Sequence, residues 1–546
     1  MDRVIIIGSG AAGLSAAIRL AEENVPSLLL TEMPAPRVQS NMAEGGINAA
    51  LDTMGQQDTP ELHEFETYKA GRFLACREAV HRLTYGAPDI VRKLYEWGMA
   101  FNVTEDGKIA LRPFGGQTKK RTAFASASTG KQLMYTLATR SRPYETCNMI
   151  KVQTGFRFLK LIQKDNCAKG ILVCEKDTNQ IFYLPASGII IASGGMNGLF
   201  GNATGSILNS GLVTASLFAD GIPLANGEMI QYHPTTTRLH SKNMLITEAV
   251  RGEGGRLWVL QNNKPFYFME VKYPELGNLM PRDVIAREEW FWLKQGIQPY
   301  LDMRDIPEQI SRHKLAGVLE ACHDFLSLDP LTEPIPVSPG IHYFMGGIEV
   351  DINHRTRIKN LYAAGEAACQ YHGANRLGGN SLLGAIFGGQ TAATSAMEDL
   401  CGKTDPYRPP ASYFQPTYWL KDRDPGLSIP LVRQELNHLL QQALGLERNA
   451  TGLLQCLKKI DLLKTASVNH YDEQACLDEN LSLLPAFLLA EGILQSALAR
   501  KESRGAHTRT DYPEEREEFR NTTLAYCKEK EVHVVFSPIE GERQAL

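Results

Sequence analysis

A glycine-rich turn near the start of the chain has the residue types and spacing needed to hold a diphosphate. Gly8, Gly10 and Gly13 form a GxGxxG pattern. The first glycine permits a tight turn, the second lets a pyrophosphate approach the backbone, and the third lets helix and strand pack closely. Glu32, 19 residues after the last glycine, is placed to accept a hydrogen bond from a ribose hydroxyl. Together these residues predict a dinucleotide site.

The segments around this turn must position it. A β-branched run at 4–7 predicts a buried parallel strand, an Ala/Leu-rich pattern to about Glu23 predicts a helix, and the apolar run at 27–30 predicts a second strand. Two more buried strands are expected much later, within 187–195 and 360–366. A nucleotide domain that is interrupted and then resumed is typical of FAD domains of the glutathione-reductase type, which favours FAD over NAD.

Composition narrows the class of protein further. The 546 residues include 57 Lys and Arg against 61 Asp and Glu, a net charge of −4, so no bulk attraction to nucleic acid or anionic lipid is expected. No apolar run approaches the ~18–20 residues that span a bilayer. The ten cysteines form no CxxC pair, so we expect no metal or iron–sulfur site of the chain's own. The first predicted strand begins too early for a secretory leader, which predicts a cytoplasmic protein.

Eight motifs then follow in a characteristic order. They are Ala43–Ile47, Arg112–Gly116, Gln231–Thr235, Thr247–Gly255, Pro281–Asp283, His342–Gly347, His372–Leu383, and Glu502–His507 with Asp511–Pro513. In this order and over nearly the whole chain, the sequence resembles the succinate dehydrogenase/fumarate reductase flavoprotein family, which also contains L-aspartate oxidase.

The resemblance implies an α/β fold in three parts. These are a Rossmann-like FAD-binding domain of the glutathione-reductase type in two pieces (1–230 and 343–400), an inserted α+β capping domain (231–342), and a C-terminal helical domain (401–546) after a Pro-rich segment at 405–410. Apolar residues that recur at helical spacing in 431–444 and 453–466 independently favour helices there. The motif 503–507 is interpreted as a loop that pins the C-terminal part to the rest.

A C4 dicarboxylate needs cations and donors around both carboxylates, and a group that moves a proton. Arg376 can clamp one carboxylate bidentately. The resemblance places His233, Thr247 and His342 around the two carboxylates, with Phe114 in the loop on the flavin side.

The resemblance also assigns the proton transfer. It implies that Arg282 exchanges the proton with the substrate carbon, and that Glu248 and Arg251 form a relay that recharges it. Glu248 and Arg251 are three residues apart, so they share one face if that segment is helical. A free guanidinium is a poor acid, so Arg282 needs a carboxylate that promptly restores its proton.

The resemblance implies many contacts to FAD. The expected cofactor-binding residues are Gly8, Gly10, Ala11, Ala12, Gly13, Glu32, Ser40, Asn41, Ala43, Glu44, Gly45, Gly46, Ser193, Gly194, Gly195, Glu366, Asn380, Ser381 and Leu382. Gln39 occupies the position of the histidine that attaches FAD covalently in membrane-bound relatives, which predicts non-covalent FAD and favours fumarate reduction over succinate oxidation. Ser210 stands where the family usually has an Asp near FAD.

Phe114 separates the two main candidate activities. Aspartate oxidases have a Glu there to accept from the substrate's ammonium, and an aromatic ring leaves such a buried charge poorly paired. The sequence therefore favours interconversion of fumarate and succinate by hydride transfer at flavin N5, with L-aspartate oxidase as the alternative. A non-catalytic FAD-binding scaffold and an enzyme acting on another enoate also stay open, although Arg282 and Arg376 argue against the scaffold.

Electrons must come from outside the chain, because it offers no iron–sulfur or haem ligands in sequence-local clusters. The resemblance implies that the partner is an iron–sulfur subunit, and it implies a peripheral place in a complex at the cytoplasmic face of the membrane.

Overall fold

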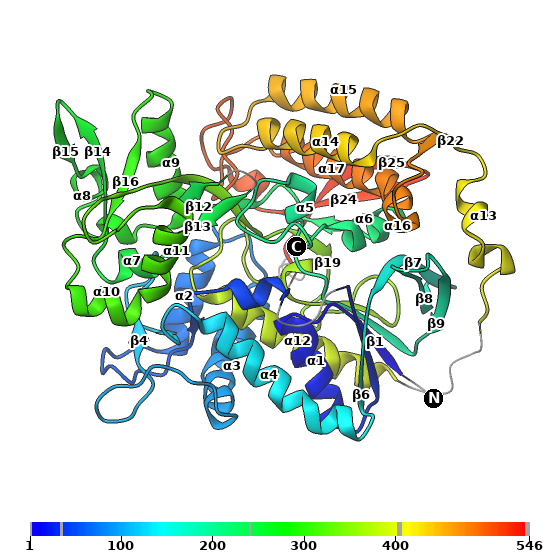
Figure 1. Cartoon of the computed structure of the whole chain (residues 1–546), viewed down its shortest axis with the longest axis horizontal. Helices are drawn as coiled ribbons and strands as arrows, with labels where there is room; N and C mark the ends of the chain where they lie inside the picture. Colours follow the sequence, from blue (N-terminus) through cyan, green and yellow to red (C-terminus); the bar gives the residue numbers. More distant parts are fainter. Residues whose placement is uncertain (1–2, 33–36, 240–241, 401–406, 541–546) are drawn as a thin grey trace.

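A parallel five-stranded sheet organises the nucleotide-binding part of the molecule (Figure 1). The structure is a computed structural model that describes residues 3–32, 37–239, 242–400 and 407–540. The sheet has the order β20 (Leu361–Ala363), β10 (Gly188–Ile191), β1 (Val4–Ile7), β2 (Ser27–Thr31) and β6 (Ile150–Thr154), with every neighbouring pair parallel. These strands confirm the predictions at 4–7, 27–30, 187–195 and 360–366. Their continuous apolar runs are buried, as expected for strands of a parallel sheet that is covered on both faces.

Helices cover one face of this sheet and a β-meander covers the other. Helix α1 (Ala11–Glu22) lies between α4 (Thr129–Thr146) and α12 (Asn380–Asp399). The approach is close because the contacts are small residues: a Cβ on Gly389 would lie 2.2 Å from the Ala12 carbonyl oxygen. The antiparallel strands β7 (Phe156–Lys164), β8 (Cys167–Glu175) and β9 (Ile181–Pro185) share an apolar core with β1 and β2.

The segment between β12 and β18 forms an α+β unit at the left of Figure 1. Strands β12 (Ile230–Arg238), β13 (Asn243–Leu245) and β18 (Ser338–Phe344) make one sheet, and β14 (Arg256–Gln261), β15 (Lys264–Phe266), β16 (Pro299–Asp302) and β17 (Ile335–Pro336) make another. Helices α8 (Phe268–Lys272), α9 (Arg282–Leu293), α10 (Glu308–Lys314) and α11 (Ala316–Leu326) complete the unit. Its own apolar cluster includes Leu257, Ile285 and Leu301.

The C-terminal part is helical as predicted, but it also contains strands that the prediction missed. Helices α14 (Ile429–Ala443), α15 (Ala450–Ser467) and α17 (Leu483–Ala499) confirm the helical spacing at 431–444 and 453–466. Strands β24 (Thr522–Lys528) and β25 (Glu531–Ser537) form a hairpin that continues the sheet of β11 (Leu224–Ala225), β19 (Gly347–Glu349) and β21 (Ala368–Cys369). This hairpin is stable because it pairs with an existing sheet edge and packs on α17.

The shorter elements connect these units. They are η2 (Gln39–Met42), β3 (Ile47–Asn48), α2 (Pro60–Ala70), α3 (Arg77–Glu96), β4 (Leu111–Arg112), β5 (Thr122–Ala123), α5 (Asn197–Phe200), α6 (Leu212–Ala219), α7 (Ala249–Gly252), η3 (Gly277–Leu279), η4 (Gly365–Ala367), η5 (Ala411–Phe414), α13 (Pro416–Leu420), β22 (Asp424–Pro425), β23 (His470–Tyr471), α16 (Leu477–Leu481) and η6 (Glu517–Phe519). The first part of the Pro-rich segment predicted at 405–410 lies outside the described residues.

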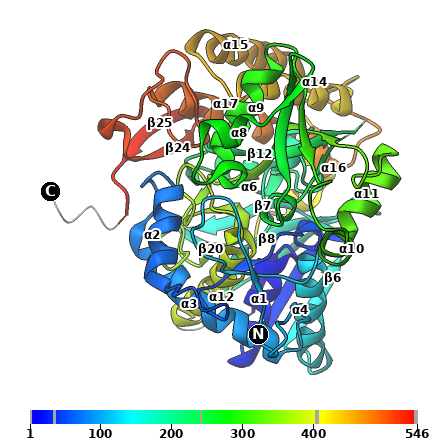
Figure 2. The same cartoon turned by 90° about the vertical axis from the view of Figure 1, so that its left-hand side faces the viewer.

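The 503–507 loop fastens the C-terminal part to the nucleotide-binding part, as predicted. Arg504 Nη1 donates to the Arg72 carbonyl oxygen at 3.0 Å, and the Ala506 N–H donates to the Ala374 carbonyl oxygen at 2.9 Å. Figure 2, turned by 90°, shows the hairpin β24–β25 and α2 on the same side of the molecule.

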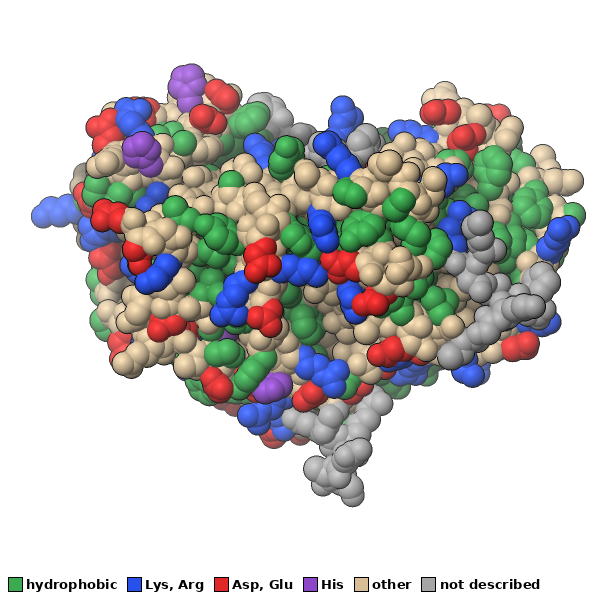
Figure 3. Space-filling model, turned by 90° about the horizontal axis from the view of Figure 1, so that it is seen from below, with side chains coloured by type: hydrophobic (Ala, Val, Ile, Leu, Met, Phe, Trp, Pro, Cys, Tyr) green, Lys and Arg blue, Asp and Glu red, His purple; other side chains and the backbone are tan. Residues whose placement is uncertain are grey.

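Two properties of the described residues bear on partners. None of their helices is long and apolar enough to cross a bilayer. On the face seen in Figure 3, acidic and basic side chains are interspersed, with no broad area of one charge sign.

Candidate functional site

One long cavity brings most of the predicted site residues together. It is lined by Gly8, Gly10, Ala11, Ala12, Glu32, Ser40, Ala43, Glu44, Gly45, Gly46, Phe114, Ser193, Gly194, His233, Thr247, Glu248, Arg282, His342, Glu366, Arg376, Ser381 and Leu382. Five predicted residues are not part of the lining: Gly13, Asn41, Gly195, Arg251 and Asn380. The cavity joins the carboxyl ends of the parallel strands to the α+β unit, so residues far apart in sequence meet there.

The nucleotide end of the cavity is built by the glycine-rich turn. Gly8 has φ +107°, and a Cβ there would lie 2.3 Å from the Ala192 carbonyl oxygen. Gly13 packs below the turn, because a Cβ there would lie 1.9 Å from the Gly8 carbonyl oxygen. Gly10 and the first residues of α1 line the cavity, so the positive end of the helix dipole faces it. The first turn of α1 carries no acidic residue that would oppose an anion there. This end is suited to a diphosphate.

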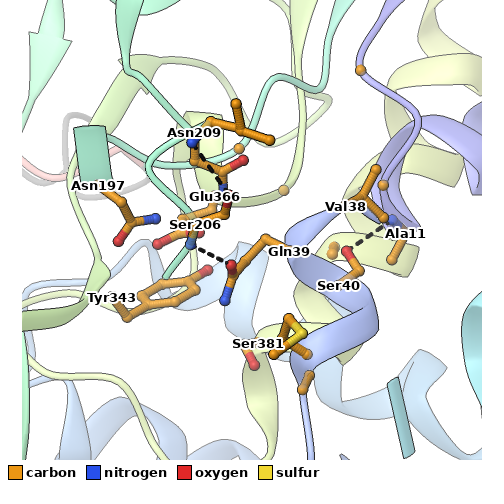
Figure 4. Close-up of a pocket in the computed structure, with 18 of the residues that line it drawn as sticks. Ala11, Val38, Gln39, Ser40, Asn197, Ser206, Asn209, Tyr343, Glu366 and Ser381 are labelled. Carbon is orange, nitrogen blue, oxygen red and sulfur yellow. Dashed lines mark hydrogen bonds between the residues drawn. The ribbon is translucent and has the colours of Figure 1, made fainter. Parts of the chain in front are cut away.

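Two side chains complete the nucleotide end. Ser40 Oγ accepts from the Ala11 N–H at 3.1 Å, which fastens η2 to the start of α1 (Figure 4). Glu32 stands at the end of β2 with its side chain 41% exposed, and its Oε2 lies 3.4 Å from Arg157 Nε. Glu32 is therefore held where the sequence pattern expects a ribose acceptor, by an arginine that the sequence analysis did not anticipate.

In the middle of the cavity, the backbone of the 43–46 segment is held in place by neighbouring side chains. Arg112 donates to the carbonyl oxygens of Glu44 and Gly45, and a Cβ on Gly45 would lie 2.9 Å from the Phe114 ring. Arg112 was not predicted as a site residue, although it opens the same motif as Phe114. Gln39 Oε1 accepts from the Ser206 N–H at 2.7 Å, so the Gln39 amide bridges two walls of the cavity (Figure 4).

Glu366 contributes a buried carboxyl to the cavity wall. It accepts from the Phe344 N–H at 3.1 Å, and burial raises its pKa to about 7. A Cβ on Gly195 would lie 2.6 Å from the Glu366 carboxyl carbon, so Gly195 makes room for this carboxyl rather than lining the cavity. Asn209 lines the wall close to Gly194 (Figure 4). Ser210 Oγ accepts from the Leu212 N–H, and nothing in the structure explains why the usual Asp is replaced there.

The side chain of Asn380 is committed to the interior. It donates to Thr67 Oγ1 at 2.9 Å, accepts from Asn48 Nδ2 at 2.7 Å, and its Oδ1 lies 3.0 Å from His63 Nε2. It is 0% exposed. Asn380 thus anchors the start of α12, and the cavity wall is formed by its neighbours Gly379, Ser381 and Leu382.

The far end of the cavity contains a buried chain of charges. Arg282, the first residue of α9, donates from Nε and Nη2 to Glu248 Oε2 at 2.9 and 2.6 Å. Glu248 Oε1 accepts from the Gly115 N–H at 2.9 Å and lies 3.2 Å from Arg251 Nη2. Burial alone would raise the pKa of Glu248, but Arg282 and Arg251 outweigh burial and lower it to about 2. The predicted Arg282–Glu248–Arg251 contact is present, with Arg251 behind the cavity wall.

Arg376 faces the same end of the cavity from the other side. It is 2% exposed, its guanidinium carbon lies 4.3 Å from the centre of the Tyr343 ring, and its Nε has no hydrogen-bond partner among the described residues. Burial, together with the charge of Arg282, lowers the pKa of Arg376 to about 9, so it stays cationic at neutral pH.

Gln231 joins the two arginines. Its Oε1 accepts from Arg282 Nη1 at 3.1 Å, and its Nε2 donates to the Arg376 carbonyl oxygen at 2.8 Å. The sequence analysis quoted Gln231 within a motif but assigned it no role. Its place in the same motif as His233 is the signal that could have found it.

Two histidines stand beside these arginines. The His233 and His342 rings are 5.0 Å apart in an edge-to-face arrangement. Their Nδ1 atoms contact Thr235 Oγ1 at 3.3 Å and Thr204 Oγ1 at 2.8 Å, leaving Nε2 as the nitrogen that can serve a ligand. Burial and the charge of Arg282 hold both pKa values well below the usual histidine range, so both rings are neutral. Thr247 lines the cavity nearby.

The glycine-rich turn and the buried arginines at the two ends of one cavity are typical of a protein that binds a dinucleotide together with an anionic ligand. The family described as FAD binding domain matches residues 3–382, and the family described as fumarate reductase flavoprotein C-term matches residues 433–544. The chain is an FAD-dependent oxidoreductase and belongs to the succinate dehydrogenase/fumarate reductase flavoprotein family.

Named relatives share nearly the full length of the chain. The succinate dehydrogenase flavoprotein subunit of Bacillus subtilis is 35% identical, covering 96% of this chain and 93% of its own. The fumarate reductase flavoprotein subunit of Mycobacterium tuberculosis is 33% identical, covering 93% and 92%. A solved structure of Escherichia coli quinol fumarate reductase superposes with a TM-score of 0.90 at 27% identity, covering 99% of this chain and 97% of that one.

Proposed function

We propose that the chain interconverts fumarate and succinate, and that fumarate reduction is the favoured direction. The observation that carries this proposal is the charge at the far end of the cavity. Three buried guanidinium groups, those of Arg251, Arg282 and Arg376, are accompanied by the ionised carboxylate of Glu248, a surplus of two positive charges. A dicarboxylate dianion neutralises this surplus, and a neutral or monoanionic substrate does not.

The residues along the cavity fit FAD. The start of α1 would hold the diphosphate, Glu32 the ribose, and the 43–46 segment with the start of α12 the flavin ring. When bound, FAD supplies hydride transfer at its N5 atom. The chain's contribution is to orient the substrate, to exclude water and to move one proton.

Arg282 is placed to move that proton. It lines the cavity, and its guanidinium shares Glu248 Oε2 between two nitrogens. A proton that leaves Arg282 for the substrate carbon can be replaced from Arg251 through Glu248, because the two oxygens of Glu248 contact one arginine each. Arg376, His233, His342 and Thr247 would hold the two carboxylates meanwhile.

The L-aspartate oxidase alternative is not favoured. The relatives named above are succinate dehydrogenases and fumarate reductases. Phe114 is 1% exposed and lies against Gly45, so it offers an apolar ring where an amino-acid substrate would need an acceptor for its ammonium group.

Measuring how candidate substrates oxidise or reduce the bound flavin tests the proposal directly. The dye-reduced protein should be reoxidised by fumarate, whereas the oxidised protein should be bleached only slowly by succinate and not by L-aspartate. Rapid bleaching by L-aspartate with release of peroxide would overturn the proposal. Equal turnover of fumarate and acrylate would argue against two carboxylate sites.

FAD is expected to leave the protein on denaturation. Gln39 has no ring nitrogen to form a bond with the flavin, and its Oε1 is engaged by the Ser206 N–H. Precipitation with trichloroacetic acid should therefore release essentially all of the flavin into the supernatant. Flavin absorbance or fluorescence that stays with the washed pellet would contradict non-covalent binding.

The two histidines are expected to add no titration to the affinity for fumarate between about pH 6 and 8. The low pKa values of His233 and His342 keep both rings neutral throughout this range, and no ordinary histidine titration intervenes. The Glu366 carboxyl, with a pKa of about 7, is the cavity group that titrates in this range. In Glu366→Gln the KM for fumarate should therefore change by less than about twofold from pH 6 to 8. A midpoint near 6.5 that persists in this variant would show that a histidine ring becomes charged.

The proposed activity also requires a partner that supplies or removes electrons. We propose that electrons pass to or from an iron–sulfur subunit, in a complex held at the cytoplasmic face of the membrane by other subunits. The relatives are themselves named flavoprotein subunits, which supports this assignment.

We also propose three domains: an FAD-binding domain formed by 1–230 and 343–400, a capping domain at 231–342, and a C-terminal domain at 401–546. This division is supported by β12 and β18, which pair with each other and lead into and out of the α+β unit.

A further inference from the structure

Three buried side chains behind the charged end of the cavity are joined to one another by hydrogen bonds. Gln231 Nε2 donates to Asn375 Oδ1 at 2.9 Å, and Asn375 Nδ2 donates to Asp283 Oδ1 at 3.0 Å. The three residues come from β12, from the segment before α12 and from α9. Together they form a polar bridge, and none of the three lines the cavity.

The polar bridge is connected to both arginines of the cavity. Asp283 directly follows Arg282, and Arg282 Nη1 donates to Gln231 Oε1 at 3.1 Å. Asn375 directly precedes Arg376, and Gln231 Nε2 also donates to the Arg376 carbonyl oxygen at 2.8 Å. Each arginine is therefore one peptide bond away from a residue of the polar bridge and is held by a second contact to Gln231.

The polar bridge is rigid because its polar atoms are buried and engaged. Gln231, Asn375 and Asp283 are 0%, 1% and 4% exposed. The second carboxylate oxygen of Asp283 accepts from Arg287 Nη2 at 3.2 Å and from Arg72 Nη2 at 3.4 Å. Separating a buried donor from its acceptor is costly, so one member cannot move without breaking the contacts of the others.

The polar bridge also joins the two sides of the cavity. Asp283 and Arg282 belong to α9 of the α+β unit, whereas Asn375 and Arg376 belong to the segment that leads into α12. The bond between Asn375 and Asp283 therefore fixes the separation of the two sides. The two guanidinium groups carry like charges that repel each other in a buried site, and the polar bridge holds them against this repulsion.

We propose that Gln231, Asn375 and Asp283 are positioning residues that set the spacing of the Arg282 and Arg376 guanidinium groups and thereby select dicarboxylates of four carbons. A diacid fits when the separation of its carboxylates matches the separation of the two cations. A longer diacid must bend or displace one arginine, and the polar bridge opposes that displacement. This inference rests on the proposed fumarate–succinate activity.

Binding of two diacids to the oxidised, FAD-loaded chain tests the inference without turnover. Fumarate and trans-glutaconate each have a trans double bond, and trans-glutaconate is one carbon longer. Titrations followed by the change in flavin absorbance give both Kd values. In the unmodified chain the Kd for trans-glutaconate should exceed that for fumarate by about tenfold or more, the discrimination that one mismatched carbon produces in a shaped pocket. Equal Kd values would overturn the inference.

Asn375→Asp breaks the polar bridge at its centre. It keeps the size of the side chain but places a carboxylate oxygen opposite Asp283 where a donor stood, so the ratio of the two Kd values should fall to about threefold or less. Adding Asp283→Asn restores a donor opposite an acceptor and should return the ratio toward that of the unmodified chain. Asn166→Asp adds the same charge at an exposed turn between β7 and β8 and is the matched control, in which the ratio should not change.

Gln231→Glu decides the outcome where Asn375→Asp does not retain FAD. Glutamate keeps the oxygen that accepts from Arg282, but it loses the N–H bonds to Asn375 and to the Arg376 carbonyl oxygen. Its charge weakens the binding of both diacids alike, so the Kd ratio isolates the spacing and should again fall to about threefold or less.

The Kd ratio of the unmodified chain in either FAD-loaded variant would overturn the inference. An FAD-loaded double variant that keeps the lowered ratio would overturn it as well, because restoring the hydrogen bond would then not restore the spacing. Failure of the unmodified chain to reduce fumarate would instead overturn the proposed function. The two failures are distinguishable, because the Kd ratio is measured without turnover.

Discussion

Replacing Arg282 by alanine is expected to lower kcat for fumarate reduction by at least about 10³-fold, within the range that a positioned proton donor contributes. Arg282 is the one arginine of the relay that lines the cavity, and its loss removes both the proton donor and one carboxylate contact. The flavin content should be unchanged, because Arg282 lies at the far end from the glycine-rich turn. Steady-state assays with a reduced dye measure kcat, and the absorbance ratio of flavin to protein measures occupancy.

The appropriate control is an arginine of the same α+β unit that does not reach the cavity. Arg312 on α10 pairs with Glu308 with its side chain 61% exposed, so Arg312→Ala should leave kcat within about twofold of the unmodified chain. Arg282→Lys restores a cation but not the fork that shares Glu248, so it should recover binding better than rate. An Arg282→Ala variant that keeps a tenth of the activity would eliminate Arg282 as the proton donor.

Replacing Arg376 by glutamine is expected to lower kcat/KM for fumarate by about 10²–10³-fold, the equivalent of about 3–4 kcal/mol. Arg376 contributes one of the two surplus positive charges and a forked donor that can hold a carboxylate at two points. Because its contact is made to bound substrate as well as to the reacting state, most of the loss should be in KM. Initial-rate measurements over a range of fumarate concentrations separate the two parameters.

The discrimination between substrates should change in the same variant. If Arg376 holds the second carboxylate, the preference for fumarate over acrylate should shrink in Arg376→Gln and be partly retained in Arg376→Lys. Arg357, with its side chain 58% exposed and paired with Glu349, provides a control in which the preference should not change. An Arg376→Gln variant with the unmodified preference would show that the second carboxylate binds elsewhere.

The nucleotide-binding core was predictable because its rules are local. The apolar run at 4–7, the glycines at 8, 10 and 13 and the following helix are contiguous, and the structure realises them as β1, the turn and α1. The hairpin β24–β25 was missed because its strands depend on pairing with β11 across about three hundred residues, and a strand's stability is decided by its neighbours in the sheet.

For the site, the sequence by itself determined which side chains are present and, through the family's motifs, which of them belong together. Tertiary structure decided their environments. Only the packing of α9 against β12 brings Arg282 to Gln231 and Glu248. The packing of α12 against α2 and β3 turns the Asn380 side chain inward, toward Thr67 and Asn48. The reason is that burial and the distances between charges set protonation and hydrogen bonding, and both are properties of the folded chain that residue spacing does not contain.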